Sequence, residues 1–368
     1  MSAIPLVDLA AQHREVAAEI ELGFARVMEA TAFVQGPEVA AFEQAFAAFS
    51  GVRHCVGVAS GTDAIELALR AAGVGPGDEV ILPANTFIAT AEAVARTGAT
   101  PVLVDCDPEF LLIDVDAVAG EIRPETKAIV PVHLFGQMAP MGRLRELAGR
   151  AGVVLIEDAA QSHGATQHGK PSGSFGLAAA TSFYPGKNLG AYGDGGAVLT
   201  DSDEIASRIG ALGNHGSVVR YHHPELGFNS RLDSLQAVVL SAKLARLPGW
   251  NQDRRDAATR YSEMLADLPG VTLPATMPGN THVWHLYVVR VPRRDEVLAA
   301  MHGAGIGAGV HYPVPVHLQG AFACLGHRRG DFPLAEESAD TMLSLPLFPQ
   351  ITELQQQQVA ELLSKMCG

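Results

Sequence analysis

The chain has 368 residues, of which 48% are hydrophobic, 18% charged and 6% aromatic, which is too apolar for a disordered protein. Its 26 Lys and Arg and 40 Asp and Glu give a net charge of −14, and no run of basic residues exceeds two, which excludes the usual basic footprint of nucleic-acid binding. No apolar run reaches the roughly 20 residues that span a bilayer, and the start shows no secretory signal.

The four cysteines lack CxxC spacing, so we expect free thiols and neither a disulfide framework nor a metal site. The composition therefore predicts a soluble globular protein of the cytoplasm, without nucleic-acid or membrane partners. At roughly 150 residues per domain, the length suggests two domains.

Short apolar runs alternate with helical patterns through the first half of the chain. The expected strands are residues 54–60, 78–83, 100–106, 127–134 and 153–158, and the expected helices between them are 63–72, 87–96, 114–122 and 141–152. This alternation predicts βαβ units and a mainly parallel sheet covered on both faces, the α/β class.

The pattern changes after about residue 165. Short strands are expected at 180–185 and 195–200, a long helical stretch at 231–250, a strand at 282–291 and a helix at 294–305. We therefore expect a large α/β domain over residues 1–240 and a smaller α+β domain over residues 241–368.

Four features could carry chemistry. Asp158 ends an apolar strand, which brings a carboxylate to the sheet edge where ligands bind. Lys187 lies among glycines between two short strands, where burial would lower the pKa of its amine. The run 60–63 (Ser-Gly-Thr-Asp) offers a helix cap or a phosphate cradle, and Phe87 offers a stacking surface. Each feature alone fits a structural role at least as well.

Together the four features match the needs of pyridoxal phosphate. Its phosphate binds at a helix N-terminus, its pyridinium nitrogen pairs with a carboxylate, and its aldehyde reacts with a lysine. The chain has no GxGxxG after a strand, no GxxxxGK[ST] and no HExxH, which argues against nucleotide and zinc enzymes.

Five stretches of the sequence resemble the sugar aminotransferases of the DegT/DnrJ/EryC1/StrS family. They are GTDAIELALRAAGVGPGDEVILPANTFIATAEAV, IEDAAQSHGA, SFYPGKNLGAYGDGGAV, FNSRLDSLQA and GIGAGVHYPVPVHLQGAF, and the resemblance runs from about residue 4 to 365. It implies the fold type I, aspartate aminotransferase-like architecture and a homodimer with active sites at the subunit interface.

The resemblance also implies roles for individual residues. Lys187 would form the Schiff base with the cofactor and then carry a proton between substrate and cofactor, and Asp158 would pair with the pyridinium nitrogen. The other implied cofactor contacts are Gln161 at the ring hydroxyl, Phe87 on the ring face, Gly61, Thr62 and Ser182 at the phosphate, and Asn229 at the phosphate of the partner subunit's cofactor. The implied substrate contacts are Tyr221, His311, Tyr312 and His317, for which packing and hinge roles remain open.

The expected reaction is amino transfer from L-glutamate to a nucleotide-linked keto-deoxysugar. A lysine at position 187 favours transamination over the sugar dehydration of relatives that carry histidine there. The segment 213–237 resembles enzymes that act at C3 of a dTDP-3-keto-6-deoxyhexose, whereas C4 enzymes more often read NYRM where this chain has NSRL. The alternatives are a C4-aminotransferase on a dTDP-, UDP- or GDP-4-keto-6-deoxysugar, a keto-cyclitol aminotransferase, and a non-catalytic regulatory homologue.

Overall fold

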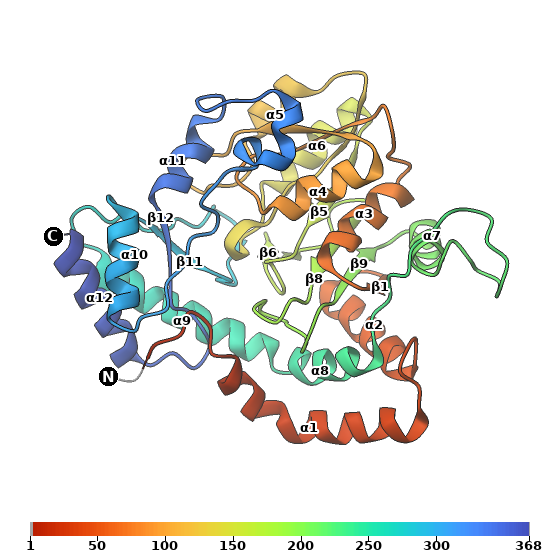
Figure 1. Cartoon of the computed structure of the whole chain (residues 1–368), viewed down its shortest axis with the longest axis horizontal. Helices are drawn as coiled ribbons and strands as arrows, with labels where there is room; N and C mark the ends of the chain where they lie inside the picture. Colours follow the sequence, from red (N-terminus) through yellow and green to blue (C-terminus); the bar gives the residue numbers. More distant parts are fainter. Residues whose placement is uncertain (1–2, 368) are drawn as a thin grey trace.

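Seven strands form the central sheet of the computed structural model, which describes residues 3–367 (Figure 1). Their order is β1-β9-β8-β5-β4-β2-β3, with bounds β1 His54–Val58, β2 Glu79–Pro83, β3 Thr100–Val104, β4 Thr126–Ile129, β5 Val154–Asp158, β8 Ala178–Ser182 and β9 Gly196–Thr200. β9 runs antiparallel to both of its neighbours, and the other four pairings are parallel. The predicted, mostly parallel α/β sheet is confirmed.

Helices cover both faces of this sheet, so successive strand residues enter different cores. Val80 and Leu82 pack beneath one layer and Ile81 beneath the other, as the twofold periodicity of a strand requires. The first layer holds α3 (Gly61–Ala71), α4 (Ile88–Thr97) and α7 (Asp203–Gly213); the second holds α2 (Pro37–Ser50), α5 (Val115–Glu121), α6 (Met141–Ala151) and α8 (Ser234–Leu244). This double coverage explains the continuously apolar strands.

A second core lies beside the large sheet. It is built from α9 (Leu247–Leu265), β11 (Tyr287–Arg290), α10 (Arg294–Gly303), β12 (Met342–Leu345) and α12 (Glu353–Cys367), with β11 antiparallel to β12. Ile4 also packs in this core, although it precedes the whole large sheet in the chain. The remaining elements are α1 (Leu9–Ala30), β6 (Thr166–Gln167), β7 (Lys170–Pro171), β10 (Asn280–Thr281), α11 (Pro333–Thr341) and the 3-10 helices η1 (Leu134–Gly136), η2 (Val316–Leu318) and η3 (Gly320–Leu325).

Three expected elements differ in extent from those that the sequence indicated. The helix expected over 231–250 is two helices, because Pro248 lies in the first turn of α9 and starts a new helix there. The strand expected over 127–134 stops at Ile129, ahead of Pro131, which has no N–H to donate to a ladder. The strand expected over 282–291 begins at Tyr287, because Trp284 has a positive φ of 47°.

The parallel pairing brings four chain segments to one edge of the sheet. β1, β2, β5 and β8 all run in the same direction, so the residues that follow their carboxyl ends meet there. These ends lead to Ser60, Phe87, Asp158 and Lys187 respectively. Four motifs that are far apart in the sequence therefore converge on one place.

Candidate active site

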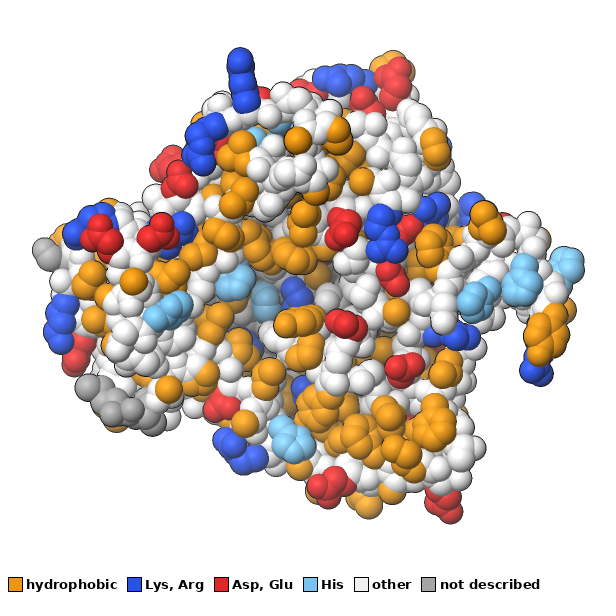
Figure 2. Space-filling model, in the orientation of Figure 1, with side chains coloured by type: hydrophobic (Ala, Val, Ile, Leu, Met, Phe, Trp, Pro, Cys, Tyr) orange, Lys and Arg blue, Asp and Glu red, His pale blue; other side chains and the backbone are white. Residues whose placement is uncertain are grey.

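A cavity of about 490 Å³ opens at this edge of the sheet. Figure 2 shows a hollow in the middle of one face of the molecule, with histidine and Lys or Arg side chains around it. The predicted site residues that line the cavity are Gly61, Thr62, Phe87, Asp158, Gln161, Ser182, Lys187, His311 and Tyr312. The structure thus brings together nine of the twelve residues singled out in the sequence.

Asp158 is held as a buried carboxylate at the end of β5. Its Oδ2 accepts a hydrogen bond from the Thr90 hydroxyl at 2.8 Å, and its Oδ1 accepts one from the Ala160 N–H at 3.2 Å. Burial raises the pKa of Asp158, and these two hydrogen bonds and the charge of Lys187 oppose that rise. A buried carboxylate in this setting is stabilised by a further positive charge.

Lys187 follows β8 in a glycine-containing turn and lines the same cavity. Its backbone N–H donates to the Tyr184 carbonyl oxygen at 2.8 Å, which forms the turn that carries the side chain. Burial lowers the pKa of Lys187 to about 8, although the charge of Asp158 acts in the opposite direction. A lysine with this pKa is a nucleophile near neutral pH.

The N-terminus of α3 forms an anion cradle opposite β8. Ser60 caps the helix by accepting a hydrogen bond from the Asp63 N–H at 3.1 Å, so the N–H groups of the first helical residues, Gly61 and Thr62, remain for a ligand. A Cβ atom at Gly61 would lie 2.5 Å from the Cβ of Ser182, so only glycine fits this close approach. The Ser182 side chain lies at the same place.

Aromatic and amide groups form a further part of the cavity wall. The rings of Phe87 and Tyr312 lie 5.0 Å apart, and Phe87 is 49% exposed, unlike a core phenylalanine. The Gln161 amide is fixed at both ends: its Oε1 accepts from the Phe135 N–H at 2.5 Å and its Nε2 donates to the Tyr312 hydroxyl at 3.2 Å. Gln161 and Tyr312 therefore form one rigid unit in the wall.

The segment that carries Asp158 is anchored by a second carboxylate. Glu157 is fully buried and accepts hydrogen bonds from His133 Nε2 and from the N–H groups of Gly173, Phe175 and Gly176. Burial raises the pKa of Glu157, but these hydrogen bonds outweigh it and lower the pKa overall. Glu157 thus pins the end of β5 from the side opposite Asp158 and plays no part in the cavity.

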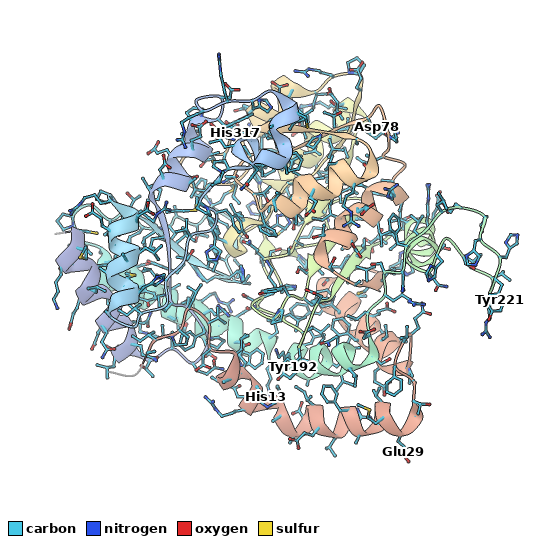
Figure 3. The ribbon with its side chains drawn as sticks, viewed as in Figure 1. His13, Glu29, Asp78, Tyr192, Tyr221 and His317 are labelled. Atoms are coloured by element: carbon cyan, nitrogen blue, oxygen red, sulfur yellow. The ribbon has the colours of Figure 1, made fainter. Side chains whose placement is uncertain are left out.

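Three predicted residues do not line the cavity of their own chain. Tyr221 lies on the loop between α7 and α8, which extends away from the body of the molecule (Figures 1 and 3), and it is 82% exposed. Asn229 is exposed at the base of the same loop. His317 departs from the expected substrate contact, because it is buried against Phe332 and its Nε2 is 2.9 Å from Glu336 Oε1 (Figure 3).

The sequence analysis assigned no role to three cavity residues. Thr90 holds the Asp158 carboxylate from α4, Tyr184 is 60% exposed at the rim, and His285 lies in the wall near Lys187. A threonine in the first turn of a helix carries no distinguishing signal. Tyr184 stands three residues before Lys187 in the same motif, and this proximity could have indicated it.

No helix within residues 3–367 is long and apolar enough to cross a membrane. All four cysteines, which lie within residues 3–367, are free thiols.

Comparison with known proteins gives a consistent match over nearly the whole chain. The profile of the DegT/DnrJ/EryC1/StrS aminotransferase family matches residues 15–364. A "dTDP-3-amino-3,4,6-trideoxy-alpha-D-glucose transaminase" from Streptomyces venezuelae is 48% identical over 95% of this chain and 92% of its own. A "pleiotropic regulatory protein" from Geobacillus stearothermophilus is 47% identical over 97% of each chain. The crystal structure of S. venezuelae DesV superposes with a TM-score of 0.97 at 46% identity, covering 100% of this chain and 99% of that one.

Proposed function

The chain belongs to the DegT/DnrJ/EryC1/StrS aminotransferase family, and on this basis we propose that it is a pyridoxal-phosphate-dependent aminotransferase that acts on a nucleotide-linked keto sugar. The observation that carries the proposal is the shared cavity of Lys187 and Asp158, which combines a lysine of lowered pKa with a buried carboxylate. The donor is L-glutamate, and the acceptor is a dTDP-3-keto-6-deoxyhexose. Amination at C3 is supported by the relative whose name specifies a dTDP-3-amino sugar.

The residues present fit the cofactor. The N–H groups at the start of α3 and the Ser182 hydroxyl would hold its phosphate, in a space that a side chain at Gly61 would fill. Asp158 would pair with the protonated ring nitrogen, whose positive charge would stabilise this buried carboxylate. Phe87 would cover the ring face, and Gln161 would contact the ring hydroxyl.

When bound, pyridoxal phosphate supplies a reactive aldehyde and a ring that withdraws electrons. The chain supplies the nucleophile and the proton carrier, for which Lys187 Nζ is the candidate because its neutral form is populated near neutral pH. Asp158 would keep the ring nitrogen protonated. His311 and Tyr312, from the smaller core's side of the cavity, would contact the nucleotide sugar.

The two-step reaction is testable by absorbance. L-Glutamate should remove the visible absorbance of the bound cofactor, and one member of a panel of keto sugars should restore it while mass spectrometry detects the amino sugar. The panel contains dTDP-3-keto and 4-keto sugars and a keto-inositol. Conversion only of a 4-keto sugar or of the keto-inositol would replace the proposed acceptor with one of those alternatives.

A lysine pair provides the control for this assay. Lys187→Ala should abolish turnover, whereas Lys127→Ala removes an exposed lysine on β4 and should leave turnover unchanged. Substantial activity in Lys187→Ala would refute the proposed role of this lysine. A wild-type protein that takes up no pyridoxal phosphate would favour the alternative of a non-catalytic regulatory homologue. One relative carries a regulatory name.

We also propose that the enzyme is a homodimer with shared active sites. The loop between α7 and α8 exposes Val218 by 73%, Tyr221 by 82% and Leu226 by 96%, a set of apolar groups that a second copy would cover. Asn229 at its base would reach the phosphate of the partner subunit's cofactor. Mixed dimers of Lys187→Ala and Asn229→Ala subunits should regain activity that neither variant has alone, and no recovery after mixing would contradict shared sites.

A further inference from the structure

One histidine in the cavity wall has no role in the proposed function. His285 is 9% exposed and lines the cavity together with Lys187. Its Nδ1 lies 3.2 Å from Oδ1 of Asn188, the residue that follows Lys187. Within residues 3–367, the Nε2 of His285 makes no hydrogen bond. This atom is also not fully enclosed by protein atoms. The Nε2 edge of the ring therefore faces the cavity.

Two backbone carbonyl groups determine which nitrogen of His285 carries the proton. Asn251 Nδ2 donates to the His163 carbonyl oxygen at 2.8 Å, so its Oδ1 is the atom that faces Asn188, at 3.0 Å. Asn188 Nδ2 donates to that oxygen and to the Val283 carbonyl oxygen at 2.9 Å. Its own Oδ1 is therefore left to accept from His285 Nδ1. An amide oxygen only accepts, so Nδ1 is protonated and Nε2 carries the lone pair.

The surroundings keep this imidazole neutral. Burial lowers the pKa of His285 well below its ordinary value, and the positive charges of Lys187 and Arg254 lower it further. At neutral pH the Nε2 of His285 therefore offers the cavity a hydrogen-bond acceptor and no proton. An acceptor held so rigidly in a largely buried wall favours ligands that bring a donor to it, because an unpaired buried acceptor is unfavourable.

We propose that His285 Nε2 accepts a hydrogen bond from a hydroxyl group on a carbon next to the carbonyl that is aminated, and so selects keto sugars that carry this hydroxyl. The inference rests on the proposed function. Asn188 anchors the imidazole one residue from Lys187, whose amine must reach the reacting carbon, so the acceptor lies near that carbon's neighbours. A sugar ring presents hydroxyl donors there. The carboxylates of L-glutamate can only accept, and its amino group is the group that is transferred, so the contact is specific to the sugar step.

Two substitutions distinguish the roles of the two ring nitrogens of His285. In His285→Asn the amide occupies the position of Nδ1 and keeps the contact to Asn188, while the group at the cavity is lost. In His285→Gln the amide reaches the position of Nε2 and keeps a carbonyl oxygen available to the cavity. His282→Asn is the matched control: His282 is also buried, but it lies outside the cavity and its Nδ1 accepts from the Trp284 N–H.

The test uses the holoenzyme converted to its amino form with L-glutamate, and measures kcat/KM for dTDP-3-keto-6-deoxyglucose and for its 2-deoxy and 4-deoxy counterparts. The wild type and His282→Asn should prefer the hydroxylated sugar over one deoxy counterpart by about tenfold to a hundredfold, the usual effect of leaving a buried acceptor unpaired. His285→Asn should lose this preference, and His285→Gln should keep most of it. The L-glutamate step should be unchanged in all variants.

Several results would overturn the inference. Equal use of all three sugars by the wild type would show that no vicinal hydroxyl is selected. A preference retained in His285→Asn but lost in His285→Gln would assign His285 a structural role through Asn188. Slowing of the L-glutamate step to the same extent as the sugar step would mean that the histidine positions Lys187. A wild type that bleaches with L-glutamate and converts none of the sugars would instead refute the proposed acceptor, and this inference with it.

Discussion

The lowered pKa of Lys187 is a measurable property of the protein without its cofactor. Burial lowers the pKa from 10.5 to about 8. At pH 7.5 an amine with a pKa of 8 is about 24% neutral, against roughly 0.1% for a pKa of 10.5, so the neutral fraction is about 200-fold larger. Since only the neutral amine is nucleophilic, reactivity should rise with pH and level off above about 8.

Competitive acetylation of the cofactor-free protein with trace acetic anhydride measures this reactivity. Mass spectrometry of the digest gives the labelling rate of each lysine across a pH series. Lys187 should show a midpoint near pH 8, whereas Lys127 and Lys365, which are exposed, serve as the reference amines in the same sample. A Lys187 midpoint that coincides with those of the reference lysines would refute the argument from burial.

The carboxylate of Asp158 allows a second test, of the direction in which a nearby charge shifts the pKa of Lys187. The negative charge of Asp158 raises the pKa of Lys187 and so partly offsets burial. Asp158→Asn removes this charge, and the midpoint should therefore move to lower pH. A midpoint that moves upward, or does not move, would mean that the two groups do not interact across the cavity as the structure indicates.

Asp158→Asn, by a second measurement, and two further substitutions test the residues that surround the site. Asp158→Asn should weaken retention of pyridoxal phosphate and lower kcat steeply, because the ring nitrogen loses its counter-charge; equilibrium dialysis and steady-state rates measure both. Gly61→Ala should weaken cofactor binding more than tenfold because its Cβ would meet Ser182 at 2.5 Å, whereas Gly75→Ala, with open space around it, should bind normally. Glu157→Gln should lower the free energy of unfolding at pH 7 by about 2–4 kcal/mol through lost hydrogen bonds to buried N–H groups, measured against exposed Glu146→Gln. Because the folded-state pKa of Glu157 is lowered, its stabilisation is present above its unfolded pKa and lost as the pH falls through the folded value, so the difference between wild type and Glu157→Gln should shrink in acid.

The sequence predicted the cofactor half of the cavity because strand ends leave a local signal. Asp158 follows an unbroken apolar run, and the Ser60 and Lys187 motifs combine a turn with glycine. The direction of parallel strands then places these motifs at one edge. These residues were therefore predictable without knowledge of contacts between side chains that are distant in the sequence.

The other half of the cavity depends on such contacts and was not predictable in the same way. His285 acquires its orientation from Asn188 and Asn251, which are 97 and 63 residues from their respective partners in the chain. A histidine in an alternating apolar stretch is indistinguishable from a core residue before these contacts are known. His317 is the opposite case: the family resemblance implied a substrate contact, with packing as the open alternative, and in the structure the side chain is buried with Glu336 as its partner.

This difference between the two halves has a consequence for specificity. The lysine, the carboxylate and the anion cradle come from the strand ends of the large sheet, which are braced by buried groups such as Glu157. His285, His311 and Tyr312 come from segments that belong to neither the strands nor the helices. On the proposed function, substitutions in these segments should change which sugar fits without moving Lys187 or Asp158. The chemistry of amino transfer and the choice of sugar should then be separable in this fold, and His285 is the position at which the variants described above test that separation.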